Sequence, residues 1–210
     1  MFKNANFAIH FMNIMNHSIH NVCVFSGSSS QAPLIHQSAA RTLGRQLAGH
    51  DMTLIYGDGS VGLMGIVANE ALAHGGRVVG VIPQFMVDNG WAKTDVTQLI
   101  ITRDMHERKQ TMAHMSDAVV ALPGGIGTME ELAETITWKQ LGLINKPIVI
   151  ANIDGYYNAF IAQLQAAVDS HYMRTLHTGL WVECTDASGI IDALLTSPQW
   201  DSNTARMAAI

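Results

Sequence analysis

Short apolar segments rich in β-branched residues alternate along this chain with segments long enough for two to four helical turns. The apolar segments are residues 22–25, 53–56, 78–82, 99–101, 118–122, 148–150 and 180–182. The helical segments are residues 38–48, 63–73, 104–115, 128–141, 156–170 and 187–195. Continuously apolar strands separated by helices are typical of a parallel sheet covered on both faces. The sequence therefore predicts an α/β fold, a doubly wound parallel sheet in three layers, α/β/α.

The length of 210 residues suits one domain. We expect that domain to span residues 21–198, between a flexible N-terminal extension (1–20) and a C-terminal tail (199–210). No apolar run reaches the ~18 residues of a membrane span, and no cleavage pattern follows the apolar stretch near the N-terminus. His10, His17 and His20 of the extension have no carboxylate or cysteine nearby in the sequence, so we expect no metal site.

The charge balance argues against nucleic acid as a partner. The chain has 12 Lys and Arg residues against 17 Asp and Glu, a formal net charge of −5. Nucleic-acid binding through a basic face is therefore not expected, although a local cationic pocket remains compatible with this charge. Cys23 and Cys184 lie far apart and lack metal-ligand spacing, which fits a reduced cytoplasmic compartment.

Small residues follow three of the predicted strands. They are Ser26-Gly27-Ser28-Ser29-Ser30, the segment from Gly57 to Gly65 that includes Gly59, and Pro123-Gly124-Gly125-Ile126-Gly127-Thr128. Glycine allows close backbone approach, and the start of a helix presents free N–H groups and a partial positive charge. Neither the dinucleotide fingerprint nor the Walker A pattern is present. The loops therefore predict a monophosphate held by backbone groups.

Arg108 falls within the apolar stripe that Met105, Met112 and Met115 form on the helix over residues 104–115. A buried arginine needs a partner, which would be either an internal carboxylate or a bound anion. Lys109 lies at the edge of the stripe, where it could contact a ligand or extend to water. Asp104 and Glu107 have the spacing of a capping box.

Acidic residues open the helix over residues 128–141. Thr128 and Glu131 have capping-box spacing, so a structural role needs no ligand. A carboxylate near an anion-binding turn could instead face a sugar carbon that becomes cationic during glycoside cleavage. Both readings of Glu131 remain open from the residues alone.

Several motifs together resemble those of the Lonely Guy family, whose members are cytokinin riboside 5′-monophosphate phosphoribohydrolases. They are Gly59-Ser60-Val61-Gly62-Leu63-Met64-Gly65, Met105-His106-Glu107-Arg108-Lys109, Pro123 through Glu131, Ile136 through Gly142, Asn145-Lys146-Pro147 and Gly155-Tyr156-Tyr157. The resemblance extends over residues 22–195. Many members carry the label lysine decarboxylase, but the sequence gives no independent sign of a pyridoxal phosphate site.

The resemblance implies a Rossmann-like homodimer that hydrolyses the N-glycosidic bond of AMP or N6-prenylated AMP, without a metal or cofactor. Arg108 and Glu131 would be the catalytic pair. Phosphate would bind at Gly124, Gly125, Gly127 and Thr128, and the remaining substrate-binding positions would be Ser26, Gly27, Gly57, Gly59, Met105, Lys109, Ile126, Met129 and Glu130. Molybdenum cofactor carriers share the glycine-rich edge, so a non-catalytic carrier of a phosphorylated pterin is the alternative.

Two positions depart from the family pattern. Asp58 stands where the family usually has the middle of three glycines, and we expect its carboxylate to point away from a phosphate or to lie at the ribose. Gly90, with Asp88 nearby, stands where the family often has a substrate-contacting glutamate after Ile82-Pro83. The preference for base or ribose can therefore differ from that of the plant enzymes.

Overall fold

The computed structural model describes residues 19–198 and residue 200. Within these residues, seven parallel strands form one sheet in the order β4-β3-β2-β1-β5-β6-β7. The strands are β1 (Asn21–Phe25), β2 (Thr53–Tyr56), β3 (Val78–Pro83), β4 (Gln98–Thr102), β5 (Ala118–Ala121), β6 (Ile148–Ala151) and β7 (Val182–Cys184). The sequence-based prediction of a parallel α/β sheet is confirmed.

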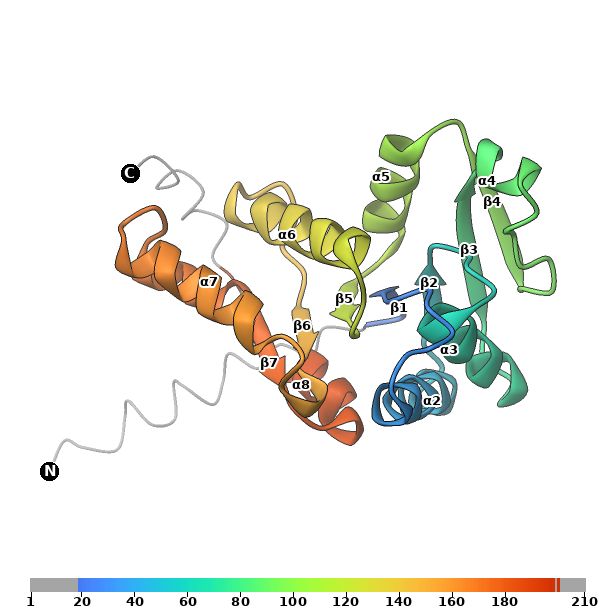
Figure 1. Ribbon diagram of the computed structural model, residues 1–210, viewed down its shortest axis with the longest axis horizontal. Coiled ribbons are helices and arrows are strands. Elements are labelled where there is room, and N and C mark those ends of the chain that lie inside the picture. Colours follow the sequence, from blue (N-terminus) through green and yellow to red (C-terminus); the bar gives the residue numbers. More distant parts are fainter. Residues whose placement is uncertain (1–18, 199, 201–210) are drawn as a thin grey trace, which may run out of the picture.

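Helices cover both faces of the sheet (Figure 1). They are α2 (Leu34–Gly49), α3 (Gly62–Ala73), α4 (Gln84–Asp88), α5 (Met105–Met115), α6 (Ile126–Gln140), α7 (Asn158–Asp169) and α8 (Ile190–Leu195), with 3₁₀ turns at Ile153–Gly155, Thr175–Leu180 and Ala187–Gly189. The side chains of α2, α3 and α8 pack in one core, and those of α5, α6 and α7 pack in the other. The result is the expected three-layer arrangement.

Alternation along the strands explains the two cores. Val22 and Val24 of β1 point into the core under α2 and α3, whereas Cys23 and Phe25 point into the core under α5 and α6. Successive strand side chains face opposite sides of a sheet, so a strand covered on both faces has to be apolar throughout. Each strand of the central pair β1 and β5 is buried in this way.

Several predicted element boundaries are wrong. The last strand begins at Val182 rather than at residue 180, because Thr175–Leu180 forms a 3₁₀ turn. Helix α2 begins four residues earlier than predicted, directly after Pro33, whose fixed φ suits the start of a helix. Helix α4 was not predicted at all.

The capping box predicted at Thr128 and Glu131 is also wrong. Helix α6 begins at Ile126 with Gly125 as its N-cap, so both residues lie inside the helix. At α5, the Asp104 carboxylate does accept from the Glu107 N–H (2.8 Å). Glu107 completes the cap by accepting from the Arg103 N–H (2.7 Å) instead of the Asp104 N–H that a capping box uses.

The structure describes residues beyond each end of the predicted domain. Of the predicted extension, only Ile19 and His20 are described; Ile19 is buried in the core, and the His20 N–H donates to Asp117. Of the predicted tail, only Trp200 is described, and its ring lies 6.2 Å from the ring of His177. Within the described part of the chain, no helix has the length and apolarity to span a membrane.

Candidate functional site

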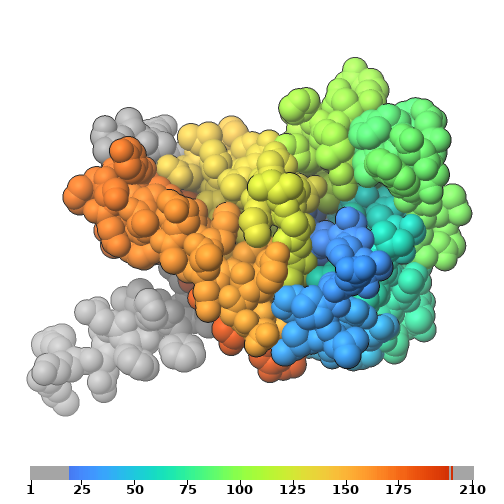
Figure 2. Space-filling model, viewed as in Figure 1, coloured from blue at the N-terminus to red at the C-terminus, as the bar shows by residue number. Residues whose placement is uncertain are grey.

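The loops that follow β1 and β5 meet at the carboxyl edge of the sheet. Strand β1 lies between β2 and β5, and the helices that follow β1 and β5 cover opposite faces. The Gly27 N–H donates to the Pro123 carbonyl at 3.0 Å, which joins the two loops. Figure 2 shows these blue and yellow-green segments in contact. In open α/β sheets, ligands bind at the carboxyl ends of two neighbouring strands whose following helices cover opposite faces.

Helix α6 starts at this junction with an uncapped first turn. No side chain of the described residues caps it, and its first turn holds no acidic residue. A Cβ added to Gly125 or Gly127 would meet no atom within 4 Å, whereas one added to Gly124 would lie 2.2 Å from Thr128 Oγ1. The backbone at Gly125 and Gly127 is therefore open beside a tightly packed glycine, and an uncapped helix start of this kind is suited to an anion.

Arg108 is buried beside the end of β2. Its guanidinium Nη2 donates to the Gly57 carbonyl and its Nε to the Val81 carbonyl, both at 3.1 Å. No ion pair joins Arg108 to a carboxylate among the described residues. Of the two partners expected for Arg108, the internal carboxylate is thus absent from the described residues; backbone carbonyls orient the guanidinium without neutralising its charge.

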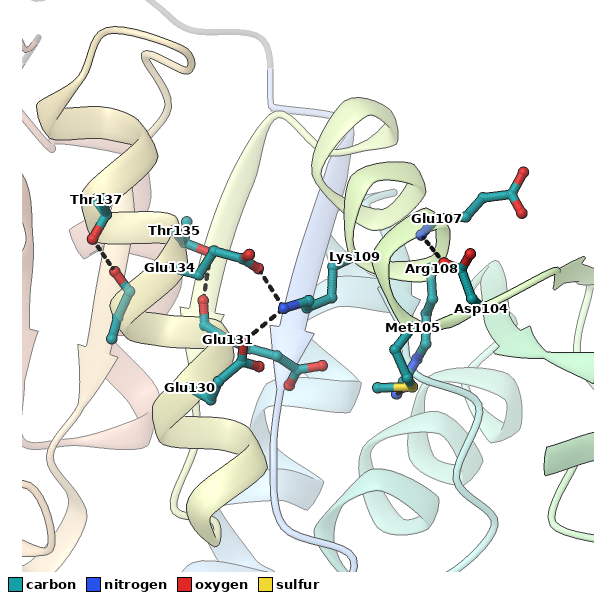
Figure 3. Close-up of polar contacts among 11 residues, drawn as sticks. Asp104, Met105, Glu107, Arg108, Lys109, Glu130, Glu131, Glu134, Thr135 and Thr137 are labelled. Carbon is teal, nitrogen blue, oxygen red and sulfur yellow. Dashed lines mark hydrogen bonds and ion pairs between the residues drawn. The ribbon is translucent and has the colours of Figure 1, made fainter. Parts of the chain in front are cut away.

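Glu131 lies half-buried on α6 and its carboxyl group extends toward α5 (Figure 3). Burial raises the pKa of Glu131 to about 7. The positive charge of Arg108 opposes this effect, while Glu130 adds to it. A carboxyl group that titrates near neutral pH can both give and take a proton, which is the property of a general acid or base.

Lys109 bridges α5 and α6. Its Nζ contacts the carboxylates of Glu130 at 2.6 Å and Glu134 at 3.0 Å. Burial opposes its charge, but the two carboxylates outweigh burial and raise the pKa of Lys109. Its side chain is 11% exposed, so it packs between the helices rather than extending freely to water.

The turn after β2 packs against α3 and α5. A Cβ at Gly57 would lie 1.6 Å from Arg108 Nη2, and one at Gly59 would lie 2.8 Å from Met64 Sδ. Asp58 points into the interior, where it accepts from the Tyr56 hydroxyl and the Lys93 N–H. Its carboxylate is thus directed away from the glycine-rich loop after β5, the first of the two placements expected for it.

Three further predicted residues form the rim. Met105 lies in the first turn of α5 with its Sδ 3.6 Å from Arg108 Nη1. Ile126 opens α6 and is 84% exposed, while Met129 is half-buried one turn along. All the predicted site residues come from the loops at one edge of the sheet or from the first two turns of the helices that follow them.

A cleft of about 390 Å³ adjoins the glycine-rich loops. Its lining includes Gly27, Gly124, His36 and Tyr156, and the Tyr156 hydroxyl donates to the Gly124 carbonyl. The ring of His36 meets that of Tyr156 edge-on at 5.3 Å. Ser26 Oγ is buried and has no hydrogen-bond partner among the described residues.

Sequence reasoning gave no role to Tyr156, His36 or Glu134. Tyr156 lies in one of the motifs that carry the family resemblance, so it could have been selected as a candidate. Glu134 lies four residues after Glu130 and hence on the same helix face, which indicates a shared partner. Nothing in the sequence around His36 indicates that it lies at the glycine-rich loops.

Known proteins with similar sequences fall in one family. A family model described as "Possible lysine decarboxylase" matches residues 64–194. A cytokinin riboside 5′-monophosphate phosphoribohydrolase of Arabidopsis thaliana is 41% identical over 188 residues, covering 89% of this chain and 86% of that protein. This chain belongs to the Lonely Guy family. A probable member from Oryza sativa subsp. japonica is 42% identical over 188 residues, covering 89% of this chain and 77% of its own.

Solved structures with the same fold include molybdenum cofactor proteins. The Moco carrier protein from Chlamydomonas reinhardtii has a TM-score of 0.63 and 25% identity, covering 83% of this Lonely Guy chain and 94% of its own. The molybdenum cofactor binding protein from Rippkaea orientalis has a TM-score of 0.63 and 22% identity, covering 84% of this chain and 95% of its own. The fold is therefore shared, while sequence similarity is higher to the phosphoribohydrolases.

Proposed function

We infer that this chain is a phosphoribohydrolase that cleaves the N-glycosidic bond of AMP, N6-prenylated AMP or both, releasing free base and ribose 5-phosphate. Relatives named as cytokinin riboside 5′-monophosphate phosphoribohydrolases, about 40% identical, support this activity. Within the structure, the supporting observation is Glu131, a half-buried carboxyl group with a pKa of about 7 on the helix that begins at the glycine-rich loop.

The substrate phosphate binds at the start of α6 in this proposal. The loop from Gly124 to Thr128 supplies N–H groups at a helix N-terminus, where the helix dipole favours negative charge. Gly27 and the buried Ser26 hydroxyl lie on the facing loop and would complete the cradle. The rim residues Ile126 and Met129 would then lie beside the bound nucleotide.

Glu131 would act at the anomeric carbon. It lies four residues beyond Gly127, about 6 Å along the helix, a separation comparable to that between the phosphate and C1′ of a nucleotide. Its carboxylate would stabilise positive charge on the ribosyl ring and accept a proton from the attacking water. The C1′–N bond breaks as the C1′–O bond forms, and the base leaves with the bonding electron pair and takes up a proton.

Arg108 would orient the substrate and the Glu131 carboxylate. Its guanidinium is held by two backbone carbonyls and keeps an unpaired positive charge near Glu131. Lys109 and Glu130, paired with each other in this structure, would line the ribose. Gly57 and Met105 would form the wall on which Arg108 rests, and Gly59 packs against Met64 in the same turn.

The decarboxylase description gains no support from the site residues. A lysine that forms a Schiff base with pyridoxal phosphate needs a neutral amine, and enzymes lower its pKa to obtain one. Lys109 instead has two carboxylate partners that raise its pKa.

We also propose that two copies of the chain associate and that they work in the cytoplasm. Leu34, Val61 and Ile126 are exposed where α2, α3 and α6 begin, so apolar side chains gather around the site edge. A second copy would cover them. Cys23 and Cys184 are both free, in keeping with a reducing compartment. A single-chain mass in sedimentation would exclude the dimer.

The first experiment is a product analysis. Purified protein is incubated separately with AMP and with isopentenyladenosine monophosphate, and chromatography measures free base and ribose 5-phosphate. Release from either substrate supports the hydrolase, and the ratio of the two rates reports the contribution of the apolar tail.

A matched pair of variants tests the catalytic carboxylate. Glu131→Gln should abolish release while circular dichroism and Tm stay close to wild type. Glu70→Gln makes the same change on α3, where Glu70 pairs with Arg45, and should leave release unchanged. Normal turnover by Glu131→Gln would remove its assignment. If wild type leaves both nucleotides intact, tight binding of a phosphorylated pterin would favour the carrier.

A further inference from the structure

Asp58 is a buried carboxylate inside the turn that follows β2. It has a left-handed backbone conformation (φ 57°) and is fully buried. Its Oδ1 accepts from the Tyr56 hydroxyl at 3.2 Å, and its Oδ2 accepts from the Lys93 N–H at 3.0 Å. Gly80 of β3 makes room for it, because a Cβ there would lie 2.0 Å from Oδ1. The side chain therefore fits closely into the space left by Gly80, and each of its two oxygens accepts a hydrogen bond.

The second of these bonds ties a distant segment to the turn. Lys93 lies in the connection between α4 and β4, 35 residues away from Asp58. In the same connection Ala92 forms an isolated antiparallel bridge with Gly59. The hydrogen bond between Asp58 and Lys93 and the bridge between Gly59 and Ala92 thus hold the turn against the connection.

The same turn carries the carbonyl that holds Arg108. Gly57 is the residue before Asp58, and its carbonyl accepts from Arg108 Nη2 at 3.1 Å. The Gly57 carbonyl belongs to the peptide group that joins it to Asp58, so a rotation of the Asp58 backbone turns this carbonyl away from the guanidinium. Because a Cβ at Gly57 would lie 1.6 Å from Nη2, the contact leaves little room for adjustment.

We propose that Asp58 is a positioning residue: by bonding Tyr56 and the Lys93 backbone, it fixes the turn whose Gly57 carbonyl aims the Arg108 guanidinium at the substrate. The proposal rests on the proposed role of Arg108. It gives a function to the one residue of this turn that departs from the glycines of the family pattern.

The charged surroundings of Asp58 make its ionised form the competent one. Tyr56 of β2, Lys93 and Asp95 of the connection, and Arg108 of α5 are the titratable or charged groups that act on Asp58 or its partners. Burial raises the pKa of Asp58 to about 6, against the hydrogen bonds and positive charges around it. Protonation would remove one acceptor and loosen the turn.

Two variants and a control test the proposal. Asp58→Asn keeps the size of the side chain but gives up one acceptor, and Asp58→Gly keeps the left-handed backbone while removing both bonds. Both should lower kcat about tenfold or more and change KM by less than about threefold, because a small displacement of a catalytic group has large effects on rate. Asp95→Asn, which alters only the solvent-side partner of Lys93, should retain wild-type kcat.

The pH profile separates positioning from a structural role. Glu131 titrates near pH 7 and Asp58 near pH 6, so log kcat/KM of wild type should fall with slope one below pH 7 and more steeply than slope one just below pH 6. Asp58→Asn should keep slope one throughout. Wild-type kcat in both variants, with only a lowered Tm, would overturn the proposal.

A readout without turnover distinguishes this proposal from the proposed function. The Arg108 Nε–H donates to the Val81 carbonyl, so its exchange with solvent reports how firmly the guanidinium is held. By NMR, Asp58→Gly should speed this exchange about tenfold. Unchanged exchange would overturn the positioning role, whether or not the wild type cleaves nucleotides.

Discussion

Lys139 is a buried lysine that the structure leaves unpaired. It lies on α6 with 3% of its surface exposed, and its Nζ has no hydrogen bond or ion pair to any of the described residues. Burial lowers the pKa of Lys139 to about 8. A buried charge without a partner destabilises the folded state, so we predict that Lys139→Met stabilises the protein at neutral pH.

The pKa gives the magnitude. A change from 10.5 to about 8 corresponds to about 3 kcal/mol at about 1.4 kcal/mol per pKa unit. Because the folded pKa of Lys139 is depressed, the unfolded chain binds more protons between pH 8 and 10.5, and the stability of wild type rises with pH there. The advantage of Lys139→Met should therefore be largest below pH 8 and mostly gone by pH 10.5.

Urea unfolding from pH 7 to 10 measures this advantage as a difference in free energy of unfolding. Methionine and lysine have similar helix propensities, so the backbone contributes little. Lys146→Met is the matched control, since Lys146 Nζ donates to the Ala113 and Ser116 carbonyls and should cost about 1–3 kcal/mol when removed. A destabilised Lys139→Met, or a gain that does not shrink toward pH 10, would refute the reasoning.

Further predictions concern the site. Because burial raises the pKa of Glu131 to about 7, kcat/KM should rise with pH through about 7 if Glu131 acts as a carboxylate; a flat profile from pH 5 to 8 would contradict this. Gly57→Ala should displace the Arg108 guanidinium, which a Cβ would approach to 1.6 Å, and lower kcat about a hundredfold in steady-state assays; wild-type kcat would refute the contact's importance. Lys109→Met removes a positive charge that lowers the pKa of Glu131, so the midpoint of the pH profile should move upward rather than stay fixed.

The layers of the fold were predictable because burial on both faces leaves a strong trace in the sequence. A strand such as Val22–Phe25 has to be apolar at every position, and the glycine-rich segments mark the strand ends. The start of α6 was not predictable in the same way, because its N-cap is Gly125 and no side chain marks the boundary. Thr128 and Glu131 then gave a false capping signal two residues later.

The partners of individual side chains depended on tertiary structure. The carbonyls that hold Arg108 belong to Val81 and Gly57, 27 and 51 residues away, and backbone groups carry no sequence signal. The position of Arg108 within the apolar stripe of its helix predicted that it is buried and needs partners, but it did not identify those partners. Tyr156 likewise reaches the Gly124 carbonyl across 32 residues, so its place beside the glycine-rich loop was visible only in the folded chain.

The charges between α5 and α6 determine which part of a nucleotide can lie there. Arg108 and Lys109 bring two positive charges, and Glu130, Glu131 and Glu134 bring three negative ones when all are ionised. A phosphate dianion would be repelled by this set when Glu131 is ionised, and it would gain no net attraction when Glu131 is protonated, because the remaining charges cancel. The uncapped N–H groups at the start of α6 favour negative charge, and no carboxylate lies in that first turn to oppose it. This charge distribution supports the proposed placement of the phosphate at the glycine-rich loop, which leaves the carboxylates for the ribose, whose developing positive charge they would stabilise.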